Sequence, residues 1–410
     1  MPLPSKSGTI LEVSEIASIN EKERRYSREI KEKKQKLSGI DEPFTVLVLL
    51  LLLIGLVCLY SASYVTAYSD GESSTAYVVR QGIFAAAGVV AMFTVAFGLK
   101  DYRKLHYLAW PLMIFSILLL ATIFIPGLWA TINKATRWIK IPGIGTFQPS
   151  EISKFAFILC FSSWSTIMGT KKMNNPIIGF GPFIICMGMT ALLLMKQPHL
   201  SAMVTIAAIG AVIIYLGGAN TWCFIGAGGG AVAFVLWYIK THTYAMARIN
   251  VWLDPFIDFR GSGWQGAQSL ITIASGGVWG LGLGQGRQKH LYLPEPANDF
   301  IFSVICEELG FIGAFIIIIL FAALVLRGYY IASKAPDRFG TLLVAGITTQ
   351  IAVQTIFNLG VVSGLLPVTG ASLPFFSYGG TSLMMLLGEM GIILAVSRRR
   401  NPEEKENKDK

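Results

Sequence analysis

The sequence predicts an all-α integral membrane protein, and three observations support that fold class. Of the 410 residues 53% are hydrophobic and only 14% are charged, whereas a soluble domain carries about 25% charged residues. The mean hydropathy is +0.57. Apolar runs of about 20 residues, the length at which a helix spans a bilayer, recur from Phe44 almost to the C-terminus.

We expect about ten transmembrane helices, which together form one polytopic domain over residues 44–397. The boundary between the sixth and seventh helices rests only on the short GGAN sequence at 217–220, and the fourth run is short. The predicted spans are 44–64, 79–99, 107–125, 152–169, 177–195, 201–217, 219–239, 300–326, 339–362 and 377–397.

Lys and Arg residues in short connections predict that both chain ends lie in the cytoplasm. With about ten spans, the basic connections fall on the same side of the membrane as the charged tails 1–43 and 398–410. The net charge of +10 therefore reflects membrane orientation and does not indicate a nucleic-acid partner. The basic connections are 100–106, 171–172, 327–338 and 398–400.

The opposite side of the membrane carries the longer connections, where a binding site is usually built. The longest, 240–299, joins the seventh and eighth helices and contains an amphipathic segment at 264–275. We expect this extracytoplasmic loop to be partly ordered against the membrane surface. The other long connections are 65–78, 126–151 and 363–376.

Asp299 is the first candidate functional residue, because it lies at the start of the eighth apolar run, directly after the loop sequence LPEPAN. An ionisable group at such a depth is a functional candidate by default. Helix capping by Asn298 or Asp299 explains the same position. This segment alone leaves both interpretations open.

A second group of candidates precedes the fourth span and continues into it. Glu151 and Lys154, in the sequence FQPSEISK, are three residues apart and share one helix face. They form either a structural ion pair near the interface or a pair that lines an aqueous cavity. Upstream, Arg137 stands beside Trp138 and either binds a phosphate or belongs to the interfacial belt.

Three further segments have open interpretations. Arg287 and Lys289 end a glycine-rich run, and glycine-rich backbone beside cations can hold phosphate. The run matches no Walker A or dinucleotide motif, so it is weak evidence for a phosphate site.

The segment 195–203, which includes His199, lines a cavity or forms a simple turn. The prolines and glycines of 363–382 interrupt the helices at a depth where protein or water must satisfy the backbone.

Taken together, these segments resemble the SEDS family (shape, elongation, division and sporulation) of the FtsW/RodA/SpoVE type. The resemblance extends from about Phe44 to Arg400 and is closer to the FtsW/SpoVE branch than to RodA. Many members have Thr before the key Asp, whereas this chain has Ala297-Asn298. The motifs are FQPSE with Lys154, GWQGAQSLITIASGG…GLGLGQGRQK, LPEPANDFIF…EELG and LPVTGASLPFFSYGGTS.

The resemblance implies a peptidoglycan glycosyltransferase. Such an enzyme polymerises lipid II, a disaccharide-pentapeptide on undecaprenyl pyrophosphate, at the outer face of the bacterial cytoplasmic membrane. The implied partners are a class B penicillin-binding protein, the transpeptidase that crosslinks the strands, and other membrane proteins of the divisome or elongasome. The motifs do not distinguish division, cell shape and sporulation.

The resemblance also assigns roles to residues at matching positions. Asp299 matches the catalytic Asp of the family. The implied substrate-binding residues are Arg137, Lys154, Gln268, Arg287 and Lys289. The implied structural residues are Glu151, Pro367, Pro374, Ser377, Gly379 and Gly380.

Metal and disulfide chemistry have little support in the sequence. The five cysteines are scattered and form no CxxC or Cys/His pattern, which argues against a zinc site or a disulfide framework. A divalent cation, Mg²⁺ or Mn²⁺, near Asp299 is the one cofactor that the resemblance leaves open, although the sequence contains no evident set of ligands for it.

Two other functions remain as alternatives. A lipid II flippase needs polar groups along a path through the bilayer, and the interior candidates Lys154, Glu307, Glu308 and Glu389 are few for that task. A non-catalytic scaffold that recruits the transpeptidase predicts that Asp299 is replaceable. A polymerase instead requires its key carboxylate at the outer face, where the predicted topology places Asp299.

Overall fold

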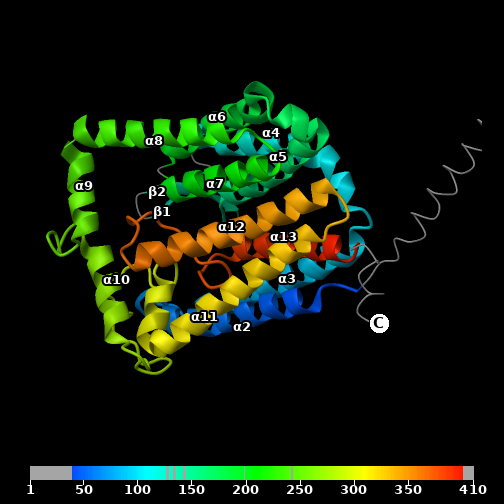
Figure 1. Ribbon diagram of the computed structural model, residues 1–410. Coiled ribbons are helices and arrows are strands. Elements are labelled where there is room, and N and C mark those ends of the chain that lie inside the picture. Colours follow the sequence, from blue (N-terminus) through cyan, green and yellow to red (C-terminus); the bar gives the residue numbers. More distant parts are fainter. Residues whose placement is uncertain are drawn as a thin grey trace, which may run out of the picture.

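The computed structural model describes residues 39–125, 129–132, 135–141, 145–197, 199–241 and 243–399, which form a bundle of long helices (Figure 1). Eight helical segments of this described chain are long and apolar enough to cross a membrane. They coincide with eight of the predicted spans and confirm an all-α membrane fold. Most of the two predicted charged tails lies outside the described residues.

Five of these eight segments come from the first half of the described chain, and three from the second. The early ones are α2 (Glu42–Ser69), α3 (Ala76–Gly98), the segment Tyr102–Phe124 with α4 (Ala109–Ala121) between the short turns Tyr102–Leu108 and Thr122–Phe124, α5 (Pro149–Met173), and Pro176–Lys196 with α6 (Gly181–Lys196) after the turn Pro176–Phe180. The later ones are α11 (Ile301–Ser333), α12 (Arg338–Val362) and α13 (Gly380–Ser397).

The sixth and seventh predicted spans are also helices, α7 (Leu200–Leu216) and α8 (Thr221–Thr241), although neither is among those eight. α8 leads into α9 (Thr243–Leu253) and α10 (Trp264–Ser275), and the three helices form an arm beside the bundle (Figure 1). The bounds of α10 match the amphipathic segment predicted at 264–275. The predicted loop 240–299 is therefore largely helical in its first half.

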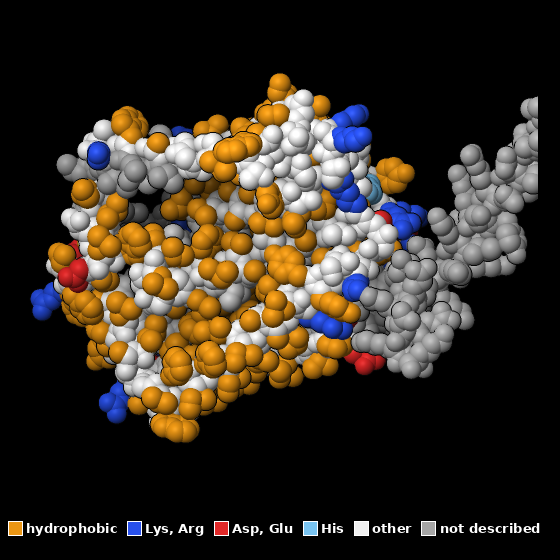
Figure 2. Space-filling model, viewed as in Figure 1, with side chains coloured by type: hydrophobic (Ala, Val, Ile, Leu, Met, Phe, Trp, Pro, Cys, Tyr) orange, Lys and Arg blue, Asp and Glu red, His pale blue; other side chains and the backbone are white. Residues whose placement is uncertain are grey.

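Each of the three helices of the arm contacts the bundle, and Ser269 of α10 donates to the carbonyl of Val362 at 2.7 Å. Phe224 of α8 packs edge-on against Phe180 and Tyr215, with ring centroids 5.1 and 5.6 Å away. The indole Nε1 of Trp252 in α9 donates a hydrogen bond of 3.0 Å to the carbonyl of Gly364. Between these anchors Figure 2 shows a hollow under α8 and beside α9, so the arm encloses an opening at this end of the molecule.

A small antiparallel sheet occupies the region 126–151, which the sequence predicted only as a connection. Its strands are β1 (Trp129–Ile132), β2 (Ala135–Ile141) and β3 (Gly145–Phe147), in the order β1-β2-β3. In its register Ile139 of β2 pairs with Trp129 on one side and with Phe147 on the other. The region is a connection between two spans, as predicted, but its strands were not foreseen, because a short alternating run such as ATRWIKI is a weak strand signal.

Carboxylates and prolines determine where several helices begin. The side chain of Asp41 accepts a hydrogen bond of 3.1 Å from the backbone N–H of Phe44 and so caps α2. Asp337 caps α12 in the same way, at 2.9 Å from the N–H of Gly340. Pro149 begins α5, a position where its missing N–H is not needed.

α11 is longer than the predicted span 300–326 and is broken at Gly310, which has φ 66° and ψ −170°. A positive φ of this size is accessible to glycine without strain. The break separates a short segment, 301–309, from the remainder of the helix. Because Asp299 lies two residues before α11, this short segment carries the main candidate residue.

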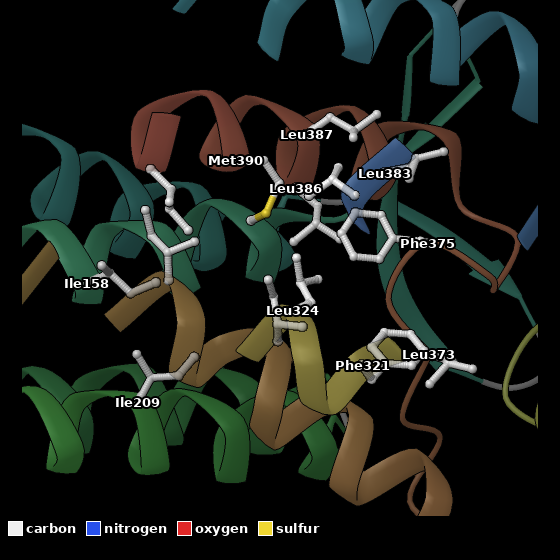
Figure 3. Packing of buried hydrophobic residues seen from close by; sticks show 14 of the residues in the cluster. Ile158, Ile209, Phe321, Leu324, Leu373, Phe375, Leu383, Leu386, Leu387 and Met390 are labelled. Atoms are coloured by element: carbon white, nitrogen blue, oxygen red, sulfur yellow. The ribbon is translucent and has the colours of Figure 1, made fainter. Parts of the chain in front are cut away.

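The buried core lies where α11, α12 and α13 meet α5 and α7. Figure 3 shows side chains from these helices and from the 363–379 segment pointing into a common interior. Dispersion contacts and apolar burial among them hold the bundle together around the site. The labelled residues are Ile158, Ile209, Phe321, Leu324, Leu373, Phe375, Leu383, Leu386, Leu387 and Met390.

Candidate active site at the start of α11

Asp299 lies at the end of the bundle opposite the first turn of α2. The far end of α11 is tied to that first turn, because Arg327 donates two hydrogen bonds of 2.9 Å to the Asp41 carboxylate. Lys and Arg side chains gather at the α2 end, on the right in Figure 2. Asp299 at the start of α11 is therefore remote from the basic end, as the predicted topology requires.

The Asp299 carboxylate faces the Arg137 guanidinium across Gly370. A Cβ atom placed on Gly370 would lie 3.2 Å from Asp299 Oδ2 and 3.5 Å from Arg137 Nη1. Gly370 also has φ +74°, a conformation that L side chains rarely adopt. The small β2 strand thus delivers a cation to the carboxylate from 162 positions earlier in the chain (299 − 137), which no sequence pattern indicated.

The surroundings raise the pKa of Asp299 to about 6. Desolvation is the largest cause, because burial disfavours the charged carboxylate, and the neighbouring Glu295 acts in the same direction. Arg137 opposes both by favouring the charged form. The residue is still partly accessible. A carboxylate with a pKa near neutrality is suited to accept a proton at physiological pH.

Hydrogen bonds from distant segments hold the backbone on both sides of Asp299. Asn358 of α12 donates from Nδ2 to the carbonyls of Asp299 and Ala371, each at 2.7 Å. Ser377 donates to the carbonyl of Asn298 at 2.7 Å and accepts from the N–H of Leu373 at 2.8 Å. The predicted break at 363–382 therefore supports the loop 291–299, here called the Asp299 loop, and forms a cradle around it.

Two of the predicted structural residues pack closely at the start of α13. A Cβ atom on Gly380 would lie 2.1 Å from the Phe84 ring of α3, so only glycine fits there. The N–H of Gly379 donates to Gln81 Oε1 at 3.1 Å. Pro374 is buried in the same segment, whereas Pro367 is exposed.

Backbone conformations rarely seen outside glycine occur beside the site. Among the described residues, the non-glycine positions with positive φ are Leu291 (67°), Glu295 (52°) and Phe375 (65°). Glu295 belongs to the Asp299 loop, and Phe375 belongs to the cradle. Such strained residues persist where the surrounding structure enforces them, and they concentrate at functional sites.

A polar chain continues from Arg137 into the bundle. Lys154 Nζ lies 2.7 Å from Glu151 Oε2, and the Lys154 side chain is only 3% exposed. His199 is buried between α6 and α7, within 3.2 Å of the amide nitrogen of Gln148. Desolvation, together with the positive charges of Arg137 and Lys154, lowers the pKa of His199 to about 3, so the imidazole is neutral at physiological pH.

Deeper in the bundle, Glu389 of α13 finds the polar partner that the sequence did not reveal. Gln350 of α12 donates from Nε2 to its carboxylate at 2.8 Å. The structure therefore brings Asp299, Arg137, Lys154 and Glu151 into one polar region, and adds His199 and Gln148 to it. The first four were already candidates from the sequence, and His199 lies in the segment 195–203, which was expected to line a cavity or form a simple turn.

The other predicted substrate-binding residues lie elsewhere. Lys289 is fully buried and forms an ion pair with Glu308. Arg287 is exposed, and its backbone N–H donates to Glu307 at 2.9 Å. Gln268 is buried on α10, and its Oε1 has no hydrogen-bond partner among the described residues. These three residues are not assembled with Asp299 in this structure.

The described residues contain no group of three or more His, Cys, Asp or Glu side chains placed to hold a metal ion. Glu295 is the acidic residue that acts on the Asp299 carboxylate, and two carboxylates alone are a sparse ligand set for Mg²⁺ or Mn²⁺. The metal dependence that the sequence left open stays a prediction.

Comparison with known proteins identifies the family. The model of the FtsW/RodA/SpoVE cell cycle proteins matches residues 42–402. The chain belongs to this family. It is 38% identical over 370 residues to a probable peptidoglycan glycosyltransferase FtsW of Trichlorobacter lovleyi, with 90% of this chain and 96% of the relative covered. It is 39% identical over 367 residues to the stage V sporulation protein E of Bacillus subtilis, covering 88% and 98%.

Solved structures of the family share the fold. A chain from a peptidoglycan synthase complex that coordinates polymerization and crosslinking superposes with a TM-score of 0.71 at 28% identity, covering 88% of this chain and 99% of that one. The rod shape determining protein RodA of Thermus thermophilus gives a TM-score of 0.62 at 26% identity, covering 88% and 97%. The protein is thus a multi-pass membrane protein of this family.

Proposed function

We propose that the protein is a peptidoglycan glycosyltransferase that polymerises lipid II at the outer face of the bacterial cytoplasmic membrane. The observation that carries this proposal is the pairing of a partly buried carboxylate, Asp299, with a cation, Arg137, across Gly370. The names of the related FtsW proteins support the same reaction. The 38% identity to one of them extends over 90% of the chain, so it includes the site.

The proposed chemistry needs one base and positive charge. A hydroxyl of the acceptor sugar attacks the anomeric carbon of the donor sugar, and Asp299 takes the hydroxyl proton. The bond from the anomeric carbon to the pyrophosphate oxygen breaks, and undecaprenyl pyrophosphate leaves with the electron pair. Arg137 stabilises the negative charge that develops on the leaving group. Lys154, further along the polar chain, is the second candidate cation.

The proposed partner is a class B penicillin-binding protein. The related solved complex couples polymerization to crosslinking, and a glycan strand leaves this active site on the side where a transpeptidase would use it. Other membrane proteins of the divisome or elongasome are proposed as further partners. The proposed orientation places both chain ends in the cytoplasm, in line with the basic side chains at the α2 end of the bundle (Figure 2).

Purified protein and lipid II test the proposed function directly. Glycan chains should form with the wild-type protein, and their yield should rise when the cognate transpeptidase is added. Parallel reactions with a chelator, with Mg²⁺ and with Mn²⁺ measure the metal dependence. Complete absence of glycan product in every arm, with folded protein confirmed by its melting curve, contradicts a polymerase.

Lipid II translocation is the second candidate, and one observation favours it. Glu151, Lys154 and Glu389 form polar contacts inside the bundle, at depths that a flippase would use. A proteoliposome assay with fluorescent lipid II distinguishes the two functions. A flippase changes the sidedness of the lipid without forming polymer, whereas the polymerase consumes it.

A further inference from the structure

The short segment 301–309 of α11 is held at its far end by the glycine-rich loop 276–289. This inference rests on the proposed function, because it concerns how Asp299 is positioned. At the Gly310 break, the N–H groups of Leu281 and Gly282 donate to the carbonyls of Glu307 and Glu308, at 3.0 and 2.9 Å. The loop thereby replaces the helix hydrogen bonds that the break removes.

The same break is completed in the reverse direction. The N–H of Phe311 donates to the carbonyl of Gly277 at 2.9 Å. A Cβ atom on Gly280 would lie 2.3 Å from the Glu308 carbonyl oxygen, and one on Gly276 would lie 2.0 Å from that of Cys306. The glycines therefore allow the loop backbone to lie directly against α11. The glycine-rich loop therefore supports the broken helix α11, whereas the sequence had suggested that it binds phosphate.

The loop also surrounds two carboxylates of α11 with donors. Glu307 accepts from the N–H groups of Arg287 and Gln288, at 2.9 and 3.3 Å from Oε1. Glu308 accepts from the N–H of Gly284 at 3.1 Å and from the hydroxyl of Ser61 at 2.6 Å. These bonds connect the loop, α2 and α11 at one point.

Lys289 supplies the charge that balances Glu308. Its side chain is 0% exposed, and its ammonium contacts the Glu308 carboxylate, the Ser61 hydroxyl at 3.1 Å and the Tyr64 ring at 4.8 Å from the centroid. An ammonium enclosed in this way has no surface left for a pyrophosphate. A buried ion pair adds little net stability compared with an apolar pair. We therefore infer that the Lys289–Glu308 pair serves to fix the orientation of the 301–309 segment.

We propose that Lys289 is a positioning residue, which acts through Glu308 to hold the 301–309 segment so that Asp299 stays opposite Arg137. The segment is about 13 Å long at 1.5 Å per residue, so a tilt at Glu308 is carried to Asp299 at the other end. Displacements of about 1 Å in a reacting group lower rates by roughly 100-fold. Asn358 holds the backbone of Asp299, and the Lys289–Glu308 pair holds the orientation of the helix behind it.

The test is the double variant Lys289→Met with Glu308→Gln, which removes both charges at similar volume and leaves no unpaired buried ion. With purified protein and lipid II, kcat should fall by about 10- to 100-fold, while KM and the melting temperature stay near the wild-type values. The acid limb of the pH–rate profile should move to lower pH, because a displaced Asp299 loses the desolvation that raises its pKa.

A matched control uses a second ion pair of the same helix, Arg327 with Asp41. Arg327→Gln with Asp41→Asn neutralises a pair beyond the Gly310 break, and Asn retains the capping ability of Asp41. Its kcat and pH profile should equal those of the wild type. Equal losses in both double variants would assign the effect to general destabilisation and overturn the positioning role.

The outcomes separate the two proposals. Wild-type kcat and pH profile in the Lys289→Met, Glu308→Gln variant overturn the positioning role and leave the polymerase intact. Failure of the wild type to polymerise lipid II overturns both. If the double variant does not fold, Ser61→Ala decides, because it removes one donor to Glu308 without a charge change. It should lower kcat severalfold at unchanged KM, and unchanged kcat contradicts the proposal.

Discussion

Two charged regions lie near the start of α11, and they differ in how completely their charges are satisfied. Around Lys289, the buried charged groups have close partners: Glu307 accepts from backbone N–H groups, and Glu308 accepts from the Ser61 hydroxyl and the Lys289 ammonium. Around Asp299, burial raises the carboxylate pKa to about 6 and Arg137 only partly compensates. The charges of the first region are paired with one another. The Asp299 carboxylate of the second region can still interact with a substrate.

This comparison also separates two interpretations of cations in family motifs. Lys289 is ten positions from Asp299 in the sequence (299 − 289), yet it is enclosed by Glu308. Arg137 is far away in the sequence and lies beside Asp299 because β2 places it there. Proximity in sequence thus did not select the cation that serves the carboxylate.

The largest effect should follow from Asp299→Asn, which preserves the size of the side chain but cannot accept a proton at neutral pH; the Asp299 side chain does not cap α11, whose N-cap is Phe300 without a side-chain hydrogen bond. Loss of a general base lowers the rate by about 10²- to 10⁴-fold. Polymerisation of lipid II should nearly vanish, while folding and transpeptidase binding persist. The matched control Asp258→Asn changes an exposed carboxylate in the same 240–299 connection. Normal polymerisation by Asp299→Asn would exclude it as the base and return the scaffold and flippase to first place.

Lys154→Ala should have the next largest effect, on stability. It leaves Glu151 without its partner in a pair that is 3% and 11% exposed, and breaking a buried pair costs about 3–5 kcal/mol. Folded yield and melting temperature should drop, and Lys154→Arg should recover much of the loss. Lys172→Ala, at the exposed end of α5, is the control. If all three variants melt like the wild type, the pair is not structurally important.

Gly380→Val should destabilise the contact between α3 and α13, because a Cβ atom at 380 would lie 2.1 Å from the Phe84 ring. Overpacking of this kind costs about 1–3 kcal/mol, which a melting curve of the purified protein detects. Gly388→Val is the control on the same helix, since a Cβ atom there meets nothing within 4 Å. Equal melting of the two variants would show that the close approach at Gly380 relaxes without penalty.

The rate of polymerisation should depend on pH through Asp299. Its pKa is raised to about 6, and the base must be deprotonated, so the rate increases as pH rises through about 6 and levels off above it. Below that value the rate should fall about tenfold per pH unit. Initial rates between pH 4.5 and 8 measure this, with melting curves to exclude unfolding. A midpoint near the ordinary value of 3.8 would mean that Asp299 is solvated.

Arg287→Gln should have the smallest effect. The side chain is exposed, and the residue contributes its backbone N–H to Glu307, which the substitution keeps. We expect less than about a twofold change in kcat and KM. A clear rise in KM for lipid II would instead favour the phosphate-binding role that the sequence motif implied. It would mean that part of the substrate binds beside Arg287.

Much of the fold could be predicted from local sequence, because membrane helices need long apolar runs and α10 has a regular amphipathic pattern. The strands β1 to β3 were missed, since short segments carry weak signals that pairing partners decide. The extension of α11 past residue 326 and its break at Gly310 were also missed. A break of this kind depends on an external loop to satisfy the backbone, and that loop is not part of the local pattern.

The sequence by itself determined that this is a helical membrane protein and that Asp299 stands where an apolar run begins. The length of an apolar run and the residues that start and stop a helix are local properties of the sequence. Only the tertiary structure decided which cation meets that carboxylate and which is enclosed elsewhere. Electrostatic partners are set by distance and burial, and both arise when β2, the 363–379 segment and the glycine-rich loop pack around α11.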